Sequence, residues 1–356
     1  MESRAGNRPA GRGTDGAPGP RAGTAPEWAR AVAPGAAAAA AVAVAATALG
    51  SLVPVVGAPV IAIVCGMAIS VARGPSARLR PGIVFTSKQV LQASIVVLGT
   101  GLSLGQVFST GARSLPVLAG TLVVTLAMAW LAGRWLGLRA DTRTLIGVGT
   151  AICGASAIAA TDAVIDADEA DVSYAIATIF TFNVVAVLLY PTLGHALGFS
   201  QHTFGLWAGT AINDLSSVVA ASAVYGHTAA SYGVIVKLTR TLAIIPICLG
   251  LAALRGSRRR GPMGGRIGFR RILPLFILGF VVAVAANTIG LIPGGWHRGL
   301  SDASTWMITA ALAAIGLSTD VRHIRRAGLR PLALGAILWV TVGLASLGLQ
   351  AVTGTL

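Results

Sequence analysis

A succession of long apolar segments limits this chain to one class of fold. Eleven segments approach the roughly 20 apolar residues that a helix needs to cross a bilayer, and only short links separate them. Only 11% of the residues are charged, compared with about 25% in soluble domains. We therefore predict an all-α, polytopic integral membrane protein with about 11 transmembrane helices. The predicted spans are 33–50, 56–73, 84–104, 115–138, 143–162, 172–197, 204–224, 229–253, 272–292, 303–319 and 330–352.

The positions of lysine and arginine predict how these helices are oriented. With the N-terminus in the cytoplasm, 22 of the 27 Lys and Arg residues fall on the cytoplasmic side, in the tail or in links. Only Arg113 and Arg298 fall on the other side, as the positive-inside rule expects. We predict a multi-pass protein of the cell membrane, with its N-terminus in the cytoplasm and its C-terminus outside. The net charge of +15 indicates no nucleic-acid partner, because the cations form no soluble basic face.

The N-terminal segment and one acidic link lead to further predictions. Residues 1–30 are rich in Gly, Pro, Ala and Arg, which favours a disordered cytoplasmic tail, and 31–356 form a single predicted transporter domain. The Ala-rich run after the tail could be a signal-peptide core, but the long tail favours a retained first helix. The link 162–171 carries five acids and is predicted outside, as a solvated loop or as a negative rim that repels anions.

Two internal similarities predict a repeat architecture. Gly101-Leu-Ser ends the third predicted span and Gly316-Leu-Ser ends the tenth, and the predicted topology places these helices in opposite orientations. Inverted repeats of this kind are typical of secondary transporters. Gly149-Thr-Ala-Ile-x3-Ser also resembles Gly209-Thr-Ala-Ile-x3-Ser, although these two segments would run parallel. Either one of them is re-entrant, or the likeness is convergence on a shared backbone requirement.

Two runs of small and polar residues lie at mid-membrane depth. The first, Gly147-Val-Gly-Thr-Ala-Ile-Cys-Gly-Ala-Ser-Ala157, fits tight helix packing or a broken helix whose freed backbone groups line a site. The second run contains Asn213 and Asp214, roughly 15 Å into its span on the helical rise. Helix packing needs no Asn-Asp pair at that depth, so the pair favours broken helices in the middle of the membrane.

Two cations lie deep in the predicted span 229–253. Lys237 and Arg240 are three residues apart and therefore project from one face of their helix. Charges in hydrocarbon cost roughly 2.5 to 3.5 kcal/mol each on insertion scales, so they persist where they pair or line a polar cavity. Asp214 could pair with either cation, and the remaining positive charge would suit an anion. The candidate substrate-binding residues are Thr150, Cys153, Gly154, Ser156, Thr210, Asn213, Asp214, Ser216, Lys237 and Arg240.

The sequence predicts neither a metal site nor a cofactor. The three cysteines lack CxxC spacing, and the five histidines lack the spacing of metal ligands. The sequence contains no HExxH or GxxxxGK[ST] motif, and Gly154-Ala-Ser-Ala-Ile158 lacks the second glycine of a nucleophile elbow. We therefore expect neither an enzyme nor a nucleotide-driven pump.

The residues around these runs resemble the YeiH-type sulfate exporter family. The resemblance covers the chain from about residue 57 to 350. It implies an inner-membrane carrier related to the broad cation/proton antiporter and anion transporter group, with broken helices crossing in mid-membrane. The matching stretches are Leu145–Ala160, Phe204–Asp214, Ile235–Arg240, Phe276–Phe280 and Ala313–Asp320.

Together these features predict a secondary active transporter. It would export a small inorganic or sulfur oxyanion, such as sulfate or sulfite, across the cytoplasmic membrane. Asp214 would serve as the coupling group for H+ or Na+, while Lys237 and Arg240 attract the anion. The alternative is an anion channel, which would need a continuous polar pore. The sequence leaves the oligomeric state open, including a homodimer.

Overall fold

The protein is helical throughout the residues that the computed structural model describes, which are 25–52, 57–74, 76–256, 275–318 and 328–356. Helix α1 begins at Ala25, inside the predicted tail; residues 1–24 and most of the basic links 254–271 and 320–330 lie outside the described part. Seven described helices are long and apolar enough to cross a membrane. The helices are α1 (Ala25–Leu52), α2 (Gly57–Arg73), α3 (Arg80–Phe85), η1 (Thr86–Val90), α4 (Leu91–Gly99), α5 (Leu104–Trp135), α6 (Ala140–Ala151), α7 (Ala155–Ile165), α8 (Glu169–Ala196), α9 (Gln201–Ala211), α10 (Leu215–Tyr225), α11 (His227–Thr241), α12 (Ile244–Gly256), α14 (Leu275–Thr288), η2 (Gly294–Trp296), α15 (His297–Ser318) and α17 (Leu329–Thr353).

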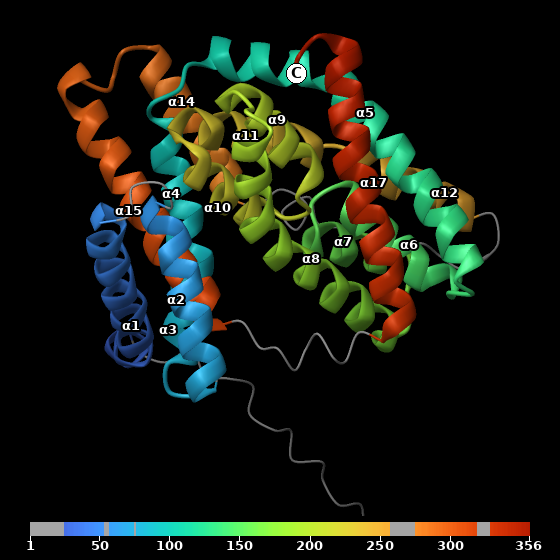
Figure 1. Cartoon of the computed structure of the whole chain (residues 1–356), viewed down its shortest axis with the longest axis horizontal. Coiled ribbons are helices and arrows are strands. Elements are labelled where there is room, and N and C mark those ends of the chain that lie inside the picture. Colours follow the sequence, from blue (N-terminus) through green and yellow to red (C-terminus); the bar gives the residue numbers. More distant parts are fainter. Residues whose placement is uncertain (1–24, 53–56, 75, 257–274, 319–327) are drawn as a thin grey trace, which may run out of the picture.

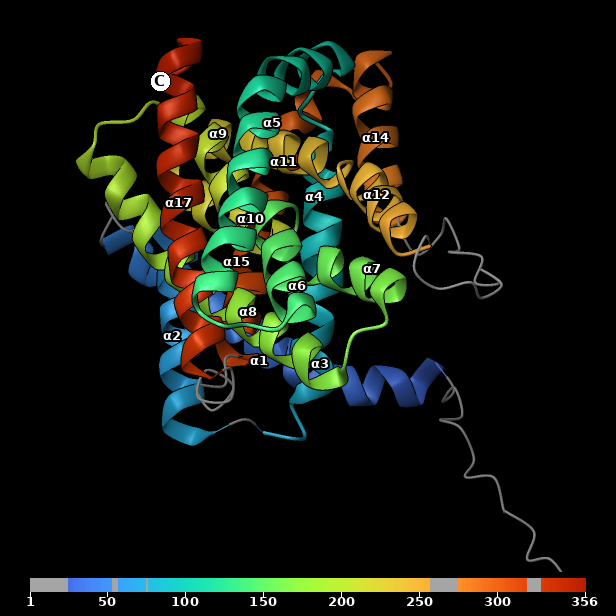
Figure 2. The same ribbon diagram turned by 90° about the vertical axis from the view of Figure 1, so that its right-hand side faces the viewer.

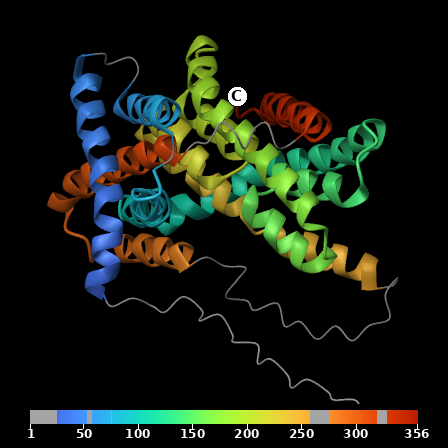
Figure 3. The same cartoon turned by 90° about the horizontal axis from the view of Figure 1, so that it is seen from below.

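Two groups of helices lie side by side (Figures 1 and 3). We call α1, α2, α3–η1–α4, α14 and α15 the N-terminal bundle, and α5 to α12 with α17 the hairpin body. Small residues hold the N-terminal bundle together at close range, because a Cβ atom on Gly66 of α2 would lie 3.1 Å from the Cα of Gly316 of α15. Large apolar side chains such as Trp130 and Val340 stay exposed on the outer helices, as expected of a surface that faces lipid.

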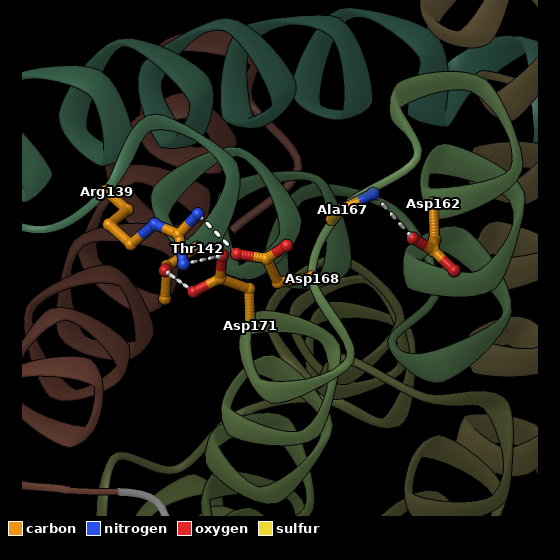
Figure 4. Close-up of polar contacts among 6 residues, drawn as sticks. All are labelled: Arg139, Thr142, Asp162, Ala167, Asp168 and Asp171. Atoms are coloured by element: carbon orange, nitrogen blue, oxygen red, sulfur yellow. Dashed lines mark hydrogen bonds and ion pairs between the residues drawn. The ribbon is translucent and has the colours of Figure 1, made fainter.

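Helices α6 and α7 form a hairpin that returns to the end of the molecule where it began (Figure 4). Arg139, just before α6, pairs with Asp168 at 2.5 Å and with Asp171 at 3.2 Å, both beyond the end of α7. The Thr142 hydroxyl donates a 2.5 Å hydrogen bond to Asp171. The hydrogen bond with Asp168 is the main cause that raises the pKa of the exposed Arg139 guanidinium above its ordinary value. The mouth of this first hairpin is therefore closed by an ion-pair cluster.

Helices α9 and α10 form a second hairpin. The Tyr225 hydroxyl, at the end of α10, donates a 2.6 Å hydrogen bond to the carbonyl oxygen of Phe199, just before α9. The Gln201 side chain accepts hydrogen bonds from the amides of Thr228 and Ala229 at 3.0 and 3.2 Å. The start of α9 and the end of α10 are thus adjacent, and the segment between them does not cross the molecule.

The two hairpins enter from opposite ends of the molecule. Helix α8 connects their mouths and, with 28 residues, is about 42 Å long on the helical rise. It begins beside the Arg139 cluster and ends where His195 stacks on Tyr225, with ring centroids 4.3 Å apart. Figure 2 shows α9 near the C-terminus and α6 toward the other end. We call these the C-terminal end and the acidic end.

This arrangement corrects part of the predicted topology. The segments 143–162 and 204–224 were predicted to be spans, and each is instead a hairpin, so the count of eleven spans is not confirmed. The acidic link 162–171 shares an end with Arg139, whereas the two were predicted on opposite sides. The positive-inside rule could not detect the errors, because neither 162–171 nor 198–203 contains Lys or Arg. Counting each hairpin as one span gives two errors that cancel. The links after 204–224 are therefore still predicted on the same sides of the membrane.

Candidate functional site

The tips of the two hairpins meet in the middle of the hairpin body. At the first tip the chain leaves α6 at Ala151 and enters α7 through Gly154, which has φ 69° and ψ −131°. A Cβ atom on Gly154 would lie 3.2 Å from the Cβ of Asp214 and 3.6 Å from its Cα. Glycine is required here because the backbone has positive φ and because the second tip approaches so closely. Both runs are therefore broken as expected, and the two breaks meet. We call the place where Gly154 meets Asp214 the crossing.

At the second tip, Asp214 is the N-cap of α10. Its carboxylate accepts a 2.8 Å hydrogen bond from the amide of Ser217. Such a cap satisfies one of the free amides at a helix start and places a negative charge at the positive end of the helix dipole. The described residues include no ion pair between Asp214 and Lys237 or Arg240, so the ion pair considered for Asp214 is not formed.

Close packing of α9 on α11 brings Lys237 to the crossing. Gly205 and Gly209 form a GxxxG pattern on α9, and a Cβ atom on Gly209 would lie 2.9 Å from the carbonyl oxygen of Gly233 on α11. The fully buried Lys237 lies one turn beyond Gly233, and its ammonium group donates a 2.7 Å hydrogen bond to the carbonyl oxygen of Ile212. A cation is favourable there because carbonyl groups at a helix end are partly negative.

Arg240 is the second cation, and no described residue forms an ion pair with it. The side chain is 2% exposed, and none of its three guanidinium nitrogens forms a hydrogen bond with a described residue. It interacts electrostatically with Lys237, with Cys153 at the first tip and with Tyr190 of α8. A buried charge without partners is costly. Arg240 therefore supplies several free donors at the crossing, where an anion would satisfy them.

The remaining candidates occupy different positions at the tips. The buried Thr150 hydroxyl and the Asn213 side-chain oxygen have no hydrogen-bond partner among the described residues. Thr210, the counterpart of Thr150, bonds to Ser346 of α17 at 2.6 Å. Ser156 is exposed, and Ser216 is partly exposed. The structure thus brings Cys153, Gly154, Asp214, Lys237 and Arg240 together, while Ser156 and Thr210 face other surroundings.

Two residues near the site were not among the sequence candidates. Tyr190 interacts electrostatically with Arg240, is 2% exposed and stacks on Trp207, with the ring centroids 4.1 Å apart. The Ser346 side chain forms a hydrogen bond with the Thr210 hydroxyl. Nothing in the sequence distinguishes either residue from the many aromatic and small residues of a membrane helix. Lys88, the other lysine of the sequence, lies exposed in η1 of the N-terminal bundle.

The chain is similar to a family and to several proteins of bacteria. The family described as Conserved hypothetical protein 698 matches residues 34–335. A UPF0324 membrane protein of Streptococcus pyogenes serotype M18 is 42% identical over 85% of this chain and 91% of its own length. One from Streptococcus mutans is 42% identical over 86% of this chain and 93% of its own length. A UPF0324 membrane protein of Fusobacterium nucleatum is 38% identical over 86% and 94%.

Proposed function

Because the chain belongs to the UPF0324 family of membrane proteins, we propose that it is a secondary active transporter for a small oxyanion. The substrate is sulfate, sulfite or a related sulfur oxyanion, and it is exported through the cytoplasmic membrane with an H+ or Na+ as coupling ion. We also propose that the N-terminus is cytoplasmic and the C-terminus outside, as the lysines and arginines predict.

The observation that carries this proposal is the buried Arg240 guanidinium, which has no hydrogen-bond partner among the described residues. It lies beside the tip of the first hairpin, where α7 begins at Ala155 without a side-chain cap. Helix starts of this kind bind anions because their free amides and dipole both favour negative charge. With Lys237 and Asp214, the crossing carries a net positive charge. A bound oxyanion would satisfy both Arg240 and the start of α7.

The arrangement of the hairpins supports alternating access. They enter from opposite ends and carry the same Gly-Thr-Ala-Ile-x3-Ser sequence at their tips, and we interpret them as an inverted pair. The helices that end near Gly101 and Gly316 also run antiparallel. Ile83, in α3, packs with Leu317 at the end of α15. Farther along the chain, the carbonyl oxygen of Ser94 accepts a hydrogen bond from Ser304, nearer the start of α15. Inverted repeats with broken helices around a central site are typical of secondary transporters.

Asp214 is the proposed coupling group, because it is an acid at the crossing of the two tips. The test is flux of labelled sulfate and sulfite in proteoliposomes under imposed proton or sodium gradients. Asp214→Asn should retain the fold, because Asn caps a helix start about as well as Asp. It should nevertheless abolish the dependence of flux on the gradient. Flux through Asp214→Asn that still follows the gradient would contradict the coupling role.

Arg240→Gln tests anion recognition in the same assay. We expect flux to fall about a hundredfold, because charged hydrogen bonds contribute roughly 1.5–3 kcal/mol each and at least one of them is lost. The matched control is Arg298→Gln, since Arg298 is an exposed arginine at the start of α15, away from the crossing. Equal losses in both variants would contradict a specific role for Arg240.

An anion channel is the second candidate. It would need a continuous polar path, whereas the polar groups described above converge at one crossing. Single-channel currents in planar bilayers decide between the two: discrete openings would favour the channel, and gradient-dependent flux without openings would favour the carrier.

A further inference from the structure

We propose a second oxyanion-binding site, in a pocket at the C-terminal end of the hairpin body. The pocket has a volume of about 540 Å³ and lies between α5, α9 and α11, beside Leu102 and Thr355. It goes beyond the proposed transport function, since it lies apart from the crossing of the hairpin tips. Its polar lining includes Gln106, Arg113, His202, Thr228, Ser231 and Tyr232.

The charge of the pocket favours an anion. Arg113 and Arg298 are the two arginines that the positive-inside rule predicts on the non-cytoplasmic side. None of the described residues that line the pocket is Asp or Glu, and Arg113 forms no ion pair with any described residue. An arginine can hold an oxyanion through two parallel hydrogen bonds. Arg113 is therefore the charged group that would bind the ligand.

The neighbouring polar groups are available as hydrogen-bond donors. The Gln106 side-chain oxygen already accepts a 2.9 Å bond from the Ser103 amide, as part of the capping box that starts α5. That bond leaves the NH₂ group of Gln106 free to donate. Arg113 also interacts electrostatically with Tyr232, which places the guanidinium near a hydroxyl group. The lining is thus rich in donors and lacks carboxylates, which suits an oxyanion.

Helix α11 connects this pocket with the central site. Its residues Ser231 and Ile235 line the pocket, and Arg240 lies only five residues beyond Ile235, roughly 7.5 Å along the axis. Between the two sites, α5 closes on α11, because a Cβ atom on Gly111 would lie 3.2 Å from the Thr239 hydroxyl oxygen. The pocket therefore ends above the central site and is separated from it by packed helices.

The pocket is large enough for a partly hydrated oxyanion. About 540 Å³ is many times the roughly 30 Å³ that one water molecule occupies in the liquid. A small oxyanion with part of its hydration shell fits this space, and so does the head group of an organic sulfonate.

Equilibrium binding of labelled sulfate to the purified full-length protein tests the proposal. The measurement is made in an Arg240→Gln background, so that binding at the crossing is removed. Adding Arg113→Gln should weaken the remaining sulfate binding about tenfold or more, and Arg113→Lys should restore part of it. Arg298→Gln, which removes the other arginine of this end, should change nothing. Unchanged binding in Arg113→Gln, or an equal loss in Arg298→Gln, would overturn the proposal.

A labelling experiment gives a second, independent measurement. Ser109 lines the pocket, so Ser109→Cys is placed in a variant with the three native cysteines replaced. A negatively charged, sulfonate-bearing thiol reagent should react about tenfold faster than a positively charged one, as attraction by one nearby cation predicts. Arg113→Gln should remove the preference, and sulfate should slow the reaction. A reaction rate independent of reagent charge would count against the site. Because neither experiment uses an ion gradient, their outcome is separate from that of the transport assays.

Discussion

The tips of the two hairpins share a short sequence motif but differ in charge at the start of their second helix. Their tips align so that Gly154 of the first occupies the position of Asp214 in the second. In the second hairpin, the Asp214 carboxylate caps the start of α10. In the first, Gly154 leaves the start of α7 without a side-chain cap. One helix start is therefore capped by an acidic side chain, while the N-cap residue of the other makes no side-chain hydrogen bond.

The difference extends to the neighbouring threonines. The Thr210 hydroxyl of the second hairpin bonds to Ser346 at 2.6 Å, and to the carbonyl oxygen of Leu206 at 2.7 Å. The buried hydroxyl of Thr150 in the first hairpin has no partner among the described residues. Buried polar groups in proteins are nearly always hydrogen-bonded. In the proposed transport function, the second hairpin therefore anchors the site and the first one receives the ligand.

The largest effect is expected from giving the first hairpin the acid of the second. Gly154→Asp would introduce a carboxylate at the start of α7, next to Asp214, in a backbone conformation with φ 69°. Sulfate binding should fall about a hundredfold or more, through repulsion by the new charge and strain of roughly 1–3 kcal/mol. Gly154→Ala is the control, because it shares the strain without the charge. Equal sulfate affinities of the two variants would show that the open cap plays no part.

The reciprocal change should have the opposite sign and a smaller size. Asp214→Gly makes the second tip resemble the first, and it removes the one negative charge described at the crossing. A glycine N-cap is only slightly weaker than an aspartate, so the fold should persist. We expect sulfate affinity to rise about tenfold, measured by equilibrium binding, while gradient-dependent flux is lost. A fall in affinity would instead mean that Asp214 contacts the anion through a bound cation or proton.

The threonine pair should give the smallest difference. Thr210→Val removes the bond to Ser346, and interhelical hydrogen bonds in membranes average about 0.6 kcal/mol. Thr150→Val removes a hydroxyl that has no partner, so it should leave stability unchanged or raise it slightly. The thermal unfolding midpoints of both variants in detergent provide the measurement. A larger destabilisation by Thr150→Val would reveal a partner for Thr150, and the contrast between the hairpins would then disappear.

Part of the fold could be predicted because insertion into a membrane depends directly on the composition of each segment. Apolar length and few charges were sufficient to predict an all-α membrane protein. The breaks at Gly154 and Asn213-Asp214 were also foreseeable, since small and polar residues at mid-depth are otherwise unfavourable. Re-entrance of one segment was left open, but both were counted as spans, because an apolar segment of about 20 residues fits one span or two short helices equally well. The repeated Gly-Thr-Ala-Ile-x3-Ser sequence was the signal that could have revealed them.

The candidate site was predicted in its residues but not in its contacts. Lys237 and Arg240 were identifiable because a charge in hydrocarbon is costly wherever the chain folds. Their partners were not identifiable, since Lys237 bonds to a backbone carbonyl group, that of Ile212. Asp214 likewise binds the amide of Ser217. Every residue has such backbone groups, so the sequence cannot show which of them a helix end leaves free.

The sequence by itself determined the membrane location, the helical fold class and the identity of the buried charges. These depend on the transfer of side chains from water to hydrocarbon. Only the tertiary structure decided that the two broken segments turn back, that Gly154 meets Asp214, and that Arg240 finds no partner in the described part of the chain. Those outcomes depend on which surfaces pack together across the molecule. Packing against α8, α11 and α17 selects one arrangement from several that the apolar pattern permits equally.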